Sequence, residues 1–242
     1  VRAATMSSGS ATLNALGLPY RFLGNVVIQG TGGASPVLTL APGITVQMNP
    51  GAGLLIGAAA PGALLAQGTA TRPITFTSAN TTKAPGDWGG IVLGQGTDPT
   101  LTVLDYCILE YGGGVPGRQA LLAVDQVTLP LQHLTLQYSQ GSGLTSYQAN
   151  LTLTSLTSRA NLDSGLQLDG GTLTLSNLTV SNNGQAGLSG YGTVSLQDST
   201  LSQNAAWGLR IDGGTWTLTN VTLTGSGADG LLPNPGNIQE TL

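Results

Sequence analysis

The pair Gly-Leu recurs at an almost constant interval through the second half of this chain of 242 residues. It stands at Gly143-Leu144, Gly165-Leu166, Gly187-Leu188, Gly208-Leu209 and Gly230-Leu231. Ala120-Leu121 precedes the first pair by nearly the same interval and reads as one more copy. A unit this short cannot enclose a core of its own. Copies at a fixed interval therefore predict a solenoid in which each coil stacks on the next.

Within each unit, apolar and polar residues alternate with a period of two. Residues 165–186 divide into three short runs, GLQL, TLTL and LTV, which are separated by the turn residues DGG and SN. Alternation of this kind is the pattern of a strand with one buried face. The repeat therefore predicts an all-β chain, folded as a right-handed parallel β-helix with about 22 residues per coil.

The alternation also assigns the residues that face the core. Because like is expected to stack on like, Leu175 should be buried between Leu153 and Leu196, with neighbouring strands about 4.8 Å apart. A shift by one residue would turn every side chain to the other face, so the burial of Leu175 tests the assignment. The expected inward residues are Leu166, Leu168, Leu173, Leu175, Leu178, Val180, Leu188, Val194, Leu196, Leu201, Leu209, Ile211, Trp216, Leu218, Val221 and Leu223.

An amide or hydroxyl residue stands four positions before each Gly-Leu pair. These residues are Ser139, Asn161, Asn183, Asn204 and Ser226. A side-chain amide carries both donors and an acceptor, so in a buried turn each Asn can bond the coil above and the coil below. We predict an asparagine ladder with Asn183 at its centre.

The first half is less regular, but four of its strings follow one another in a recognisable order. They are LTLAPGITV (residues 38–46), GALLAQGTATRPITFTS (62–78), PGDWGGIVL (85–93) and LDYCILEYGG (104–113). In these strings the chain resembles a family of bacterial exported proteins with right-handed parallel β-helix repeats. The resemblance covers roughly residues 20–115 and implies that fold. It implies no single function, because such domains occur in surface proteins, adhesin-like proteins and some polysaccharide-active enzymes.

We predict a single solenoid domain over residues 1–242, with irregular coils in 1–119 and regular coils in 120–242. Loops are expected to leave the coils at 83–90, 94–100 and 112–118, and Trp88 is expected to staple the first of them. The abrupt ends at Val1 and Leu242 predict a fragment of a longer polypeptide.

Composition limits the partners. Only 7% of the residues are charged and the net charge is −4, which argues against binding to nucleic acid or to anionic lipid. The longest weakly polar stretch, 53–66, is too short to cross a bilayer, so no membrane insertion is expected. Cys107 is the single cysteine, which excludes a disulfide within the chain and favours a small core residue over a nucleophile. We expect a secreted or cell-surface protein.

Two carboxylates at one coil position are the most specific candidates for chemistry. Asp169 and Asp212 each stand four positions after the Gly of a Gly-Leu pair, and Tyr191 takes that position in the coil between them. Two coil steps separate the carboxylates by roughly 10 Å, near the upper end of the range for an inverting glycosidase. Each Asp also opens an Asp-Gly-Gly turn, where the side chain would bond its own backbone. The turn interpretation is favoured over catalysis.

The other ionisable residues are isolated in the sequence. Asp105, Glu110, Asp125 and Asp198 belong to no recognisable motif, and Glu110 is expected to be exposed. His133 is the only histidine and is expected at an outward strand position, with no second ligand at metal-binding spacing. Phosphate-binding, dinucleotide and calcium-repeat motifs are absent from the sequence. We therefore expect no catalytic residue, metal or cofactor, and the sequence leans away from an enzyme.

Threonine forms outward columns of two kinds. The residues eight positions before each Gly-Leu pair are Thr135, Thr157, Thr179, Thr200 and Thr222. A second face with the pattern Thr-x-Thr contains Thr172, Thr174, Thr215 and Thr217. Flat arrays of this kind occur on solenoid ice-binding proteins, whereas threonine is also simply a favoured residue on exposed strands. The second explanation is preferred.

Three functions remain open at this point. The leading one is a structural or adhesive solenoid that presents a binding surface to an unknown surface, carbohydrate or protein ligand. The second is a polysaccharide-binding or polysaccharide-cleaving β-helix that uses Asp169, Tyr191 and Asp212, with Trp207, Tyr191 and Tyr147 as its aromatic residues. The third is a protein that binds ice or another crystal surface through its threonine columns.

Overall fold

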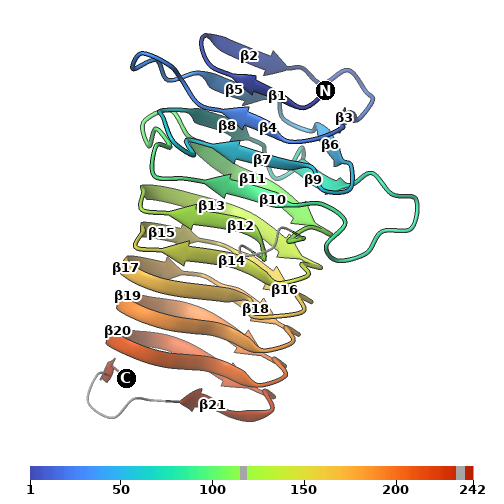
Figure 1. Cartoon of the computed structure of the whole chain (residues 1–242). Coiled ribbons are helices and arrows are strands. Elements are labelled where there is room, and N and C mark those ends of the chain that lie inside the picture. Colours follow the sequence, from blue (N-terminus) through green and yellow to red (C-terminus); the bar gives the residue numbers. More distant parts are fainter. Residues whose placement is uncertain (115–118, 233–237, 242) are drawn as a thin grey trace.

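The computed structural model describes residues 1–114, 119–232 and 238–241. Within these ranges the regular secondary structure is all strand, and the strands pair in parallel from rung to rung. Figure 1 shows the rungs stacked along one axis, with the two ends of the chain at opposite ends of the stack. The predicted all-β parallel β-helix is confirmed. A membrane-spanning helix, long and apolar enough to cross a bilayer, is not found among the described residues.

Each coil contributes strands to three faces, named here faces one, two and three in chain order. Face one contains β1 (Ala4–Met6), β4 (Val26–Ile28), β7 (Gly53–Ile56), β10 (Gly90–Leu93), β12 (Ala120–Asp125), β14 (Ser142–Tyr147), the first parts of β17 (Leu166–Ser176), β19 (Ala186–Ser202) and β20 (Trp207–Thr224), and β21 (Ala228–Leu232). Face two contains β2 (Ser10–Leu13), β5 (Val37–Leu40), β8 (Ala63–Gln67), the first parts of β11 (Val103–Glu110) and β13 (Thr128–Gln137), β15 (Asn150–Thr154), further parts of β17, β19 and β20, and β22 (Ile238–Thr241). Face three contains β3 (Tyr20–Phe22), β6 (Thr45–Met48), β9 (Ile74–Ser78), the ends of β11 and β13, β16 (Thr157–Arg159), β18 (Thr179–Ser181) and the ends of β19 and β20.

Strand pairing fixes which residues lie one above another. In the second half, Leu144 on face one pairs with Leu166, one repeat unit further along the chain. In the first half, Leu54 on the same face pairs with Ile91, across a clearly longer stretch of chain. The faces thus stay in register while the coil length changes, because the extra residues leave the stack as loops.

The expected match of Ala120-Leu121 to the Gly-Leu pairs is wrong by one residue. Ala120 pairs with Ser142, and Leu122 pairs with Leu144. Leu121 therefore stands where the later coils have Gly. The misalignment arose because this coil lacks the glycine that marks the position elsewhere.

The core is a set of stacked aliphatic columns. Leu175 pairs with Leu153 on one side and with Leu196 on the other, and all three side chains are fully buried. The inward assignment is therefore correct, with like stacked on like. Three of the expected inward residues, all in β20, are only partly buried and pack against the core: Leu218, Val221 and Leu223.

The asparagines of three successive coils are joined in series at the corner between faces three and one. Asn161 Nδ2 donates to Asn183 Oδ1 at 2.9 Å, and Asn183 Nδ2 donates to Asn204 Oδ1 at 2.9 Å. The amides also bond the backbone: Asn183 Nδ2 donates to Ser158 O at 3.3 Å, and Asn183 Oδ1 accepts from the Asn161 N–H at 3.2 Å. All three asparagines are buried. Their amides satisfy turn groups that water does not reach.

The glycine of the repeat and the asparagines belong to one packing arrangement. A Cβ added at Gly165 would lie 2.9 Å from Asn183 Nδ2 and 2.3 Å from a methyl group of Val180. A Cβ at Gly187 would lie 2.6 Å from Asn204 Nδ2. Atoms do not pack this closely, so glycine is the residue that leaves room for the buried amide of the following coil. The repeat of Gly thus accompanies the repeat of Asn.

The corner between faces two and three is made by a single residue with a left-handed backbone. In five successive coils these residues are His133 (φ 50°), Ser155 (φ 56°), Asn177 (φ 55°), Asp198 (φ 50°) and Asn220 (φ 53°). Asn and Asp tolerate this conformation better than most residues. His133 lies within β13 with a side chain that is 36% exposed, as expected, but it stands at a corner where the turn interrupts the alternation.

Longer loops leave the stack in the first half. Residues 79–89 connect β9 to β10 and extend away from the rungs in Figure 1. Trp88 in this loop is fully buried, and its Nε1 donates to Glu110 O at 2.8 Å, so it staples the loop to the next coil as expected. The loop expected at 94–100 lies between β10 and β11. Of the loop expected at 112–118, residues 115–118 lie outside the described residues.

Candidate functional site

The end of face one carries a column in which carboxylates and tyrosines alternate. From rung to rung the paired residues are Asp125, Tyr147, Asp169 and Tyr191. Each belongs to the last position of its face-one strand segment, just before the turn to face two. The column therefore presents an acidic group and an aromatic ring in turn along the axis of the solenoid.

Asp212 follows this column at a break in the register. Tyr191 pairs with Gly213, and a register shift just before this pair leaves Asp212 as the extra residue of a β-bulge. Its Oδ1 accepts a hydrogen bond from Arg210 Nε at 2.8 Å. The last carboxylate of the series is thus paired with a cation.

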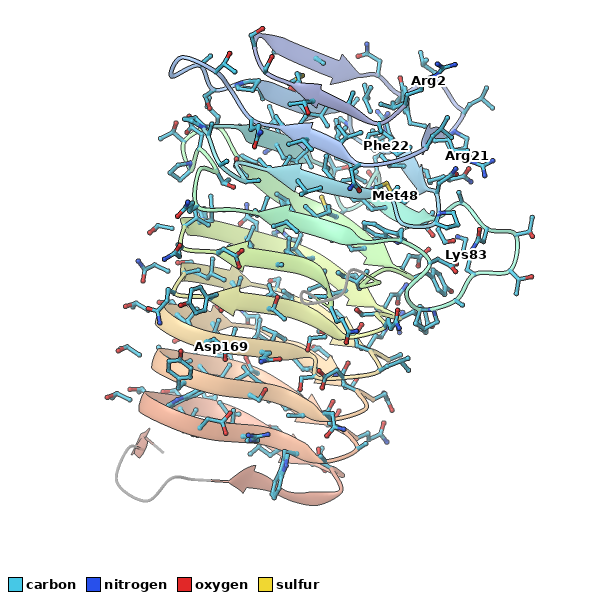
Figure 2. All side chains as sticks on the ribbon, viewed as in Figure 1. Arg2, Arg21, Phe22, Met48, Lys83 and Asp169 are labelled. Atoms are coloured by element: carbon cyan, nitrogen blue, oxygen red, sulfur yellow. The ribbon has the colours of Figure 1, made fainter. Side chains whose placement is uncertain are left out.

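Two adjoining hollows follow the column along face one. The larger, of about 740 Å³, runs beside Asp125 and Tyr147. The smaller, of about 260 Å³, reaches Trp207, Arg210 and Asp212. Both are lined by Asp163, Gln167 and Asp169, so we treat them as one feature, the axial groove. Figure 2 labels Asp169 on β17, in the middle of the stacked rungs of the second half.

The surroundings of Asp169 shift the pKa of its carboxyl, and burial is the largest cause. Burial raises the pKa of its carboxyl above the ordinary value, and the charge of Asp212 raises it further. A hydrogen bond from Gln167 Nε2, at 3.4 Å, opposes these effects on the pKa. Asp169 and Asp212 line the same hollow, where like charges oppose one another.

The structure gives the two carboxylates different partners from the turn bonds expected from the sequence. Their side-chain hydrogen bonds come from Gln167 and Arg210 on face one. The glycines shape the turn themselves: Gly171 has a φ of 88°, and a Cβ there would lie 1.9 Å from Ala149 O. The carboxylates are therefore presented to the groove.

The two tyrosines of the column expose their rings. Tyr147 is 53% exposed and Tyr191 is 41% exposed. In the described part of the chain, ring stacking is found elsewhere, between Tyr106 and His133 and at one further tyrosine pair. Open rings along a rigid sheet offer flat apolar surface to a ligand that has a matching flat face.

Sequence reasoning found part of this column. It grouped Asp169, Tyr191 and Asp212. It named Tyr147 as an aromatic hint of a polysaccharide site but did not place it in this column, although the residue also stands four positions after a repeat glycine, Gly143. It missed Asp125 because that residue stands four positions after Leu121, in the coil that lacks the glycine. Counting from the Gly143-Leu144 pair would have placed Tyr147 in the column, whereas only the strand register places Asp125 there.

The threonine columns lie in register on faces three and two. On face three the stacked residues are Thr135, Thr157, Thr179, Thr200 and Thr222. On face two one column contains Thr172, Thr193 and Thr215, and its neighbour contains Thr152, Thr174, Ser195 and Thr217. These side chains are exposed or half-buried, in agreement with the outward placement expected from the alternation.

Asp105, expected to be isolated, is bound by residues of the next coil. His133 Nδ1 lies 2.8 Å from Asp105 Oδ1, and Gln132 Nε2 donates to the other carboxylate oxygen at 3.3 Å. The His133 ring stacks on Tyr106 with 4.1 Å between centroids. Over residues 1–114, 119–232 and 238–241, no three His, Cys, Asp or Glu side chains gather to hold a metal ion. The sequence could not show this pair, because the coil that separates its members is longer than the repeat unit of the second half.

Glu110 and Asp198 are likewise partnered. Glu110, expected to be exposed, has a side chain only 16% exposed, and its Oε2 accepts from Gln137 Nε2 at 2.8 Å. Lys83, which is labelled in Figure 2, belongs to the loop at 79–89, and its Nζ lies 3.6 Å from Glu110 Oε1. Asp198 Oδ1 accepts from Asn220 Nδ2 at 2.9 Å. These carboxylates bind neighbouring coils and the loop, and they do not form an open site.

Cys107 is a core residue, as expected. Its thiol is fully buried and lies 3.3 Å from Ala66 O, to which it donates. Burial raises the pKa of the Cys107 thiol to about 12. A thiol that stays protonated in the core has no use as a nucleophile.

The match to a protein-family model supports the fold. The model of the pectate-lyase-like β-helix domain family matches residues 5–115, which contain the four strings that suggested β-helix repeats. Among solved structures, a mutant of the periplasmic alginate epimerase AlgG is 12% identical, with a TM-score of 0.42 over 93% of this chain and 71% of that chain. The A-modules of the mannuronan C-5 epimerases AlgE6 and AlgE4 from Azotobacter vinelandii are 13% and 12% identical, with TM-scores of 0.38 and 0.36, over 99% of this chain and 90% and 91% of theirs. No curated protein matches the chain.

Proposed function

We propose that this parallel β-helix binds a polysaccharide along the axial groove of face one. The observation that carries the proposal is the column of exposed tyrosines and carboxylates beside the groove. Sites for sugars combine flat aromatic surface, against which the C–H groups of a pyranose pack, with polar side chains that bond its hydroxyl groups. Tyr147 and Tyr191 supply the first, and Asp169 and Gln167 supply the second.

The shape of the groove favours a polymer over a small molecule. It continues across several rungs of face one, and rungs lie about 4.8 Å apart. A linear chain of sugars laid along the solenoid axis would meet the same kinds of side chain repeatedly. A ligand of this kind also fits the secreted or cell-surface location expected from the sequence.

The arrangement supports binding better than cleavage. Asp169 and Asp212 are separated by about two strand spacings, ~10 Å, which is slightly more than the roughly 6.5–9.5 Å of inverting glycosidases. Asp212 is also engaged by Arg210, so one of its carboxylate oxygens already has a cationic partner within its own strand. We therefore expect no turnover of the bound polymer.

The matching family model bears on this proposal through its name, since pectate lyase acts on a polysaccharide. The matched residues precede the groove, so the groove itself is the main support. The structural or adhesive role expected from the sequence stays a prediction.

The test is affinity electrophoresis in gels that contain single soluble polysaccharides, followed by titration calorimetry with oligosaccharides of any polymer that retards the protein. Tyr147→Ala and Tyr191→Ala should each weaken binding about tenfold through the loss of ring stacking. Thr152→Ala, an exposed change on face two, is the matched control and should bind as wild type does. Binding that is unchanged in both tyrosine variants, or no retardation by any polymer, contradicts the proposal.

A second candidate is binding to ice or to another crystalline surface by the threonine column of face three. The unbroken register from Thr135 to Thr222 favours it, because equivalent hydroxyls then repeat at the strand spacing. The measurement is thermal hysteresis of the wild type and of Thr179→Leu, whose larger side chain would break the array. Absence of hysteresis in the wild type removes ice as the ligand.

A further inference from the structure

The charged residues are divided unequally between the two ends of the solenoid. Residues 1–86, which form the first coils, contain four of the 7 basic residues and none of the 11 acidic ones. The net charge of −4, which argues against anionic lipid when it is taken over the whole chain, therefore averages a positive first part and a negative remainder. The basic residues of the first part are Arg2, Arg21, Arg72 and Lys83.

The first coils also carry exposed leucines. Over residues 1–114 and 119–227, Leu16 and Leu18 are the most exposed large apolar side chains, at 72% and 77%. They belong to the loop between β2 and β3, which turns at Gly17 (φ 77°) and is closed by a hydrogen bond from Tyr20 Oη to Asn14 O at 2.8 Å. A short, closed loop thus holds two leucines in water, where they remain unless another surface covers them.

Basic side chains adjoin these leucines. Leu16, Leu18 and Arg72 line one hollow of about 590 Å³, and Gln47 forms part of its wall. Arg21, which is labelled in Figure 2, pairs with Gln47 in the strand register, so a second basic residue neighbours that wall. We call the set of Leu16, Leu18, Arg21 and Arg72 the basic apolar patch.

The two arginines of the patch have neutral hydrogen-bond partners. Arg21 Nε donates to Asn49 Oδ1 at 2.7 Å, and one Nη of Arg72 donates to Pro42 O at 2.7 Å. A guanidinium group has five N–H donors, so each arginine keeps donors for an anionic oxygen. Since residues 1–86 contain no carboxylate side chain, the positive charge of the patch is not neutralised by its own coils.

We propose that the basic apolar patch docks this protein on a membrane surface that contains anionic phospholipids. The leucines enter the boundary between headgroups and acyl chains, and the guanidinium groups bind lipid phosphates. The docking is peripheral, with no segment that crosses the bilayer. The patch and the axial groove belong to different coils, so the inference is independent of the proposed polysaccharide binding.

A second copy of the chain fits the patch less well than a lipid surface does. The acidic residues of a copy are spread over the coils from Asp87 onward. Several of them already have partners, such as Asp98 with Thr100 and Asp212 with Arg210. A copy therefore offers scattered, partly neutralised charges, whereas an anionic bilayer offers a continuous negative surface with an apolar layer beneath it.

The first experiment is cosedimentation with large unilamellar vesicles of two compositions, phosphatidylcholine alone and phosphatidylcholine mixed with phosphatidylglycerol. The protein should sediment with the mixed vesicles at low salt, and the bound fraction should fall as salt is added. Binding to phosphatidylcholine alone should be weaker by on the order of tenfold, because two arginines then meet no net negative surface.

Variants of the patch locate the contact. Leu16→Ser combined with Leu18→Ser should weaken binding to the mixed vesicles about tenfold, and Arg72→Gln should weaken it about fivefold. The matched controls are Leu162→Ser and Arg159→Gln, which change exposed residues of the same types in the later coils and should bind as wild type does. Melting temperatures show that each variant is folded.

A fluorescent label tests whether the leucine loop enters the lipid. Cys107 is fully buried, so a polarity-sensitive dye reacts with the thiol added by Leu18→Cys, or by Leu162→Cys in the control. Emission should shift to shorter wavelength on the mixed vesicles for the Leu18→Cys protein and stay unchanged for the control. An equal response of the two labelled proteins overturns the assignment of the patch.

Three other results also overturn the proposal. The first is absence of binding to the mixed vesicles, and the second is equal binding to both kinds of vesicle. The third is a dimer, seen by sedimentation velocity without lipid, that is lost when Leu16→Ser and Leu18→Ser are combined, because the patch then serves a second copy of the chain.

Discussion

The regular coils after residue 119 and the irregular coils before it fill the same interior corner in different ways. In the regular coils the corner between faces three and one holds Asn161, Asn183 and Asn204, each with a glycine beside it. In the last irregular coil a Cβ at Gly112 would lie 2.7 Å from the Trp88 ring and 3.0 Å from Leu121. Small polar residues fill this corner in the regular coils, and large apolar residues fill it in the last irregular coil.

This difference teaches what a β-helix requires of its sequence. Coils of constant length allow an identical residue to follow at each rung, so buried amides can bond one another in series. Coils of unequal length break that series, and each corner needs its own solution, such as a buried tryptophan that closes a loop. The register of the three faces is common to both regions and is set by the aliphatic columns.

The largest effect is expected at the side chain that closes the irregular region. Trp88→Ala should lower the free energy of unfolding by about 3–5 kcal/mol, because it removes a fully buried indole and leaves a cavity. Trp88→Phe keeps most of the volume and loses the bond to Glu110 O, so it should cost less, about 1–3 kcal/mol. Equilibrium urea unfolding measures both. A cost below about 1 kcal/mol for the alanine variant would contradict the staple.

A core leucine of the regular region should come next. Leu175→Ala should cost about 2–5 kcal/mol, since the side chain is fully buried between Leu153 and Leu196. Leu162→Ala is the matched control, because Leu162 is 60% exposed and its truncation leaves no cavity. The same unfolding measurement separates them. Equal stability of the two variants would break the assignment of inward and outward positions.

The asparagine series should show a smaller, position-dependent effect. Asn183→Leu should cost about 1–3 kcal/mol, because it leaves Asn161 and Asn204 each without an amide partner. Asn161→Leu and Asn204→Leu each interrupt only one amide–amide bond and should cost less. Thermal melts of the three variants rank them. If Asn183→Leu has the melting temperature of the wild type, hydrogen bonding between successive asparagines is not what distinguishes the regular coils.

The smallest effect concerns pH, and it has opposite signs in the two regions. Burial raises the folded-state pKa of Asp169, so its contribution to stability is present below the unfolded pKa and is lost as pH rises through the folded one. The hydroxyl of Thr100 lowers the pKa of Asp98, whose contribution is present above the unfolded pKa and is lost as pH falls through the folded one.

Unfolding midpoints measured across the acidic range test this contrast. Asp169→Asn should remove a loss of stability that the wild type shows as pH rises, and Asp98→Asn should remove a loss that it shows as pH falls. The differences should be small because both carboxylates keep contact with solvent. Parallel pH profiles for the two variants would contradict the opposite pKa shifts.

The sequence by itself determined the fold, the inward positions of the regular coils and the alignment of their asparagines and threonines. It could do so because vertical neighbours in these coils are separated by a nearly constant stretch of chain, so that counting along the chain is equivalent to moving up the solenoid. The alternation of apolar residues then fixed which side faces the core. Asp169 and Tyr191 were grouped by the same counting.

Where counting along the sequence fails, only the tertiary structure decided which residues are neighbours in adjacent coils. Asp105 and His133 are paired across a longer coil, and no fixed interval of the sequence joins them. Only the strand register places Asp125 in the column of Tyr147, because its coil has Leu121 where the later coils have the repeat glycine. Coil length is free to vary because loops leave at the corners, whereas strand pairing holds the rungs in register. The contacts between coils, and with them the axial groove, therefore depend on the pairing and not on distance along the chain.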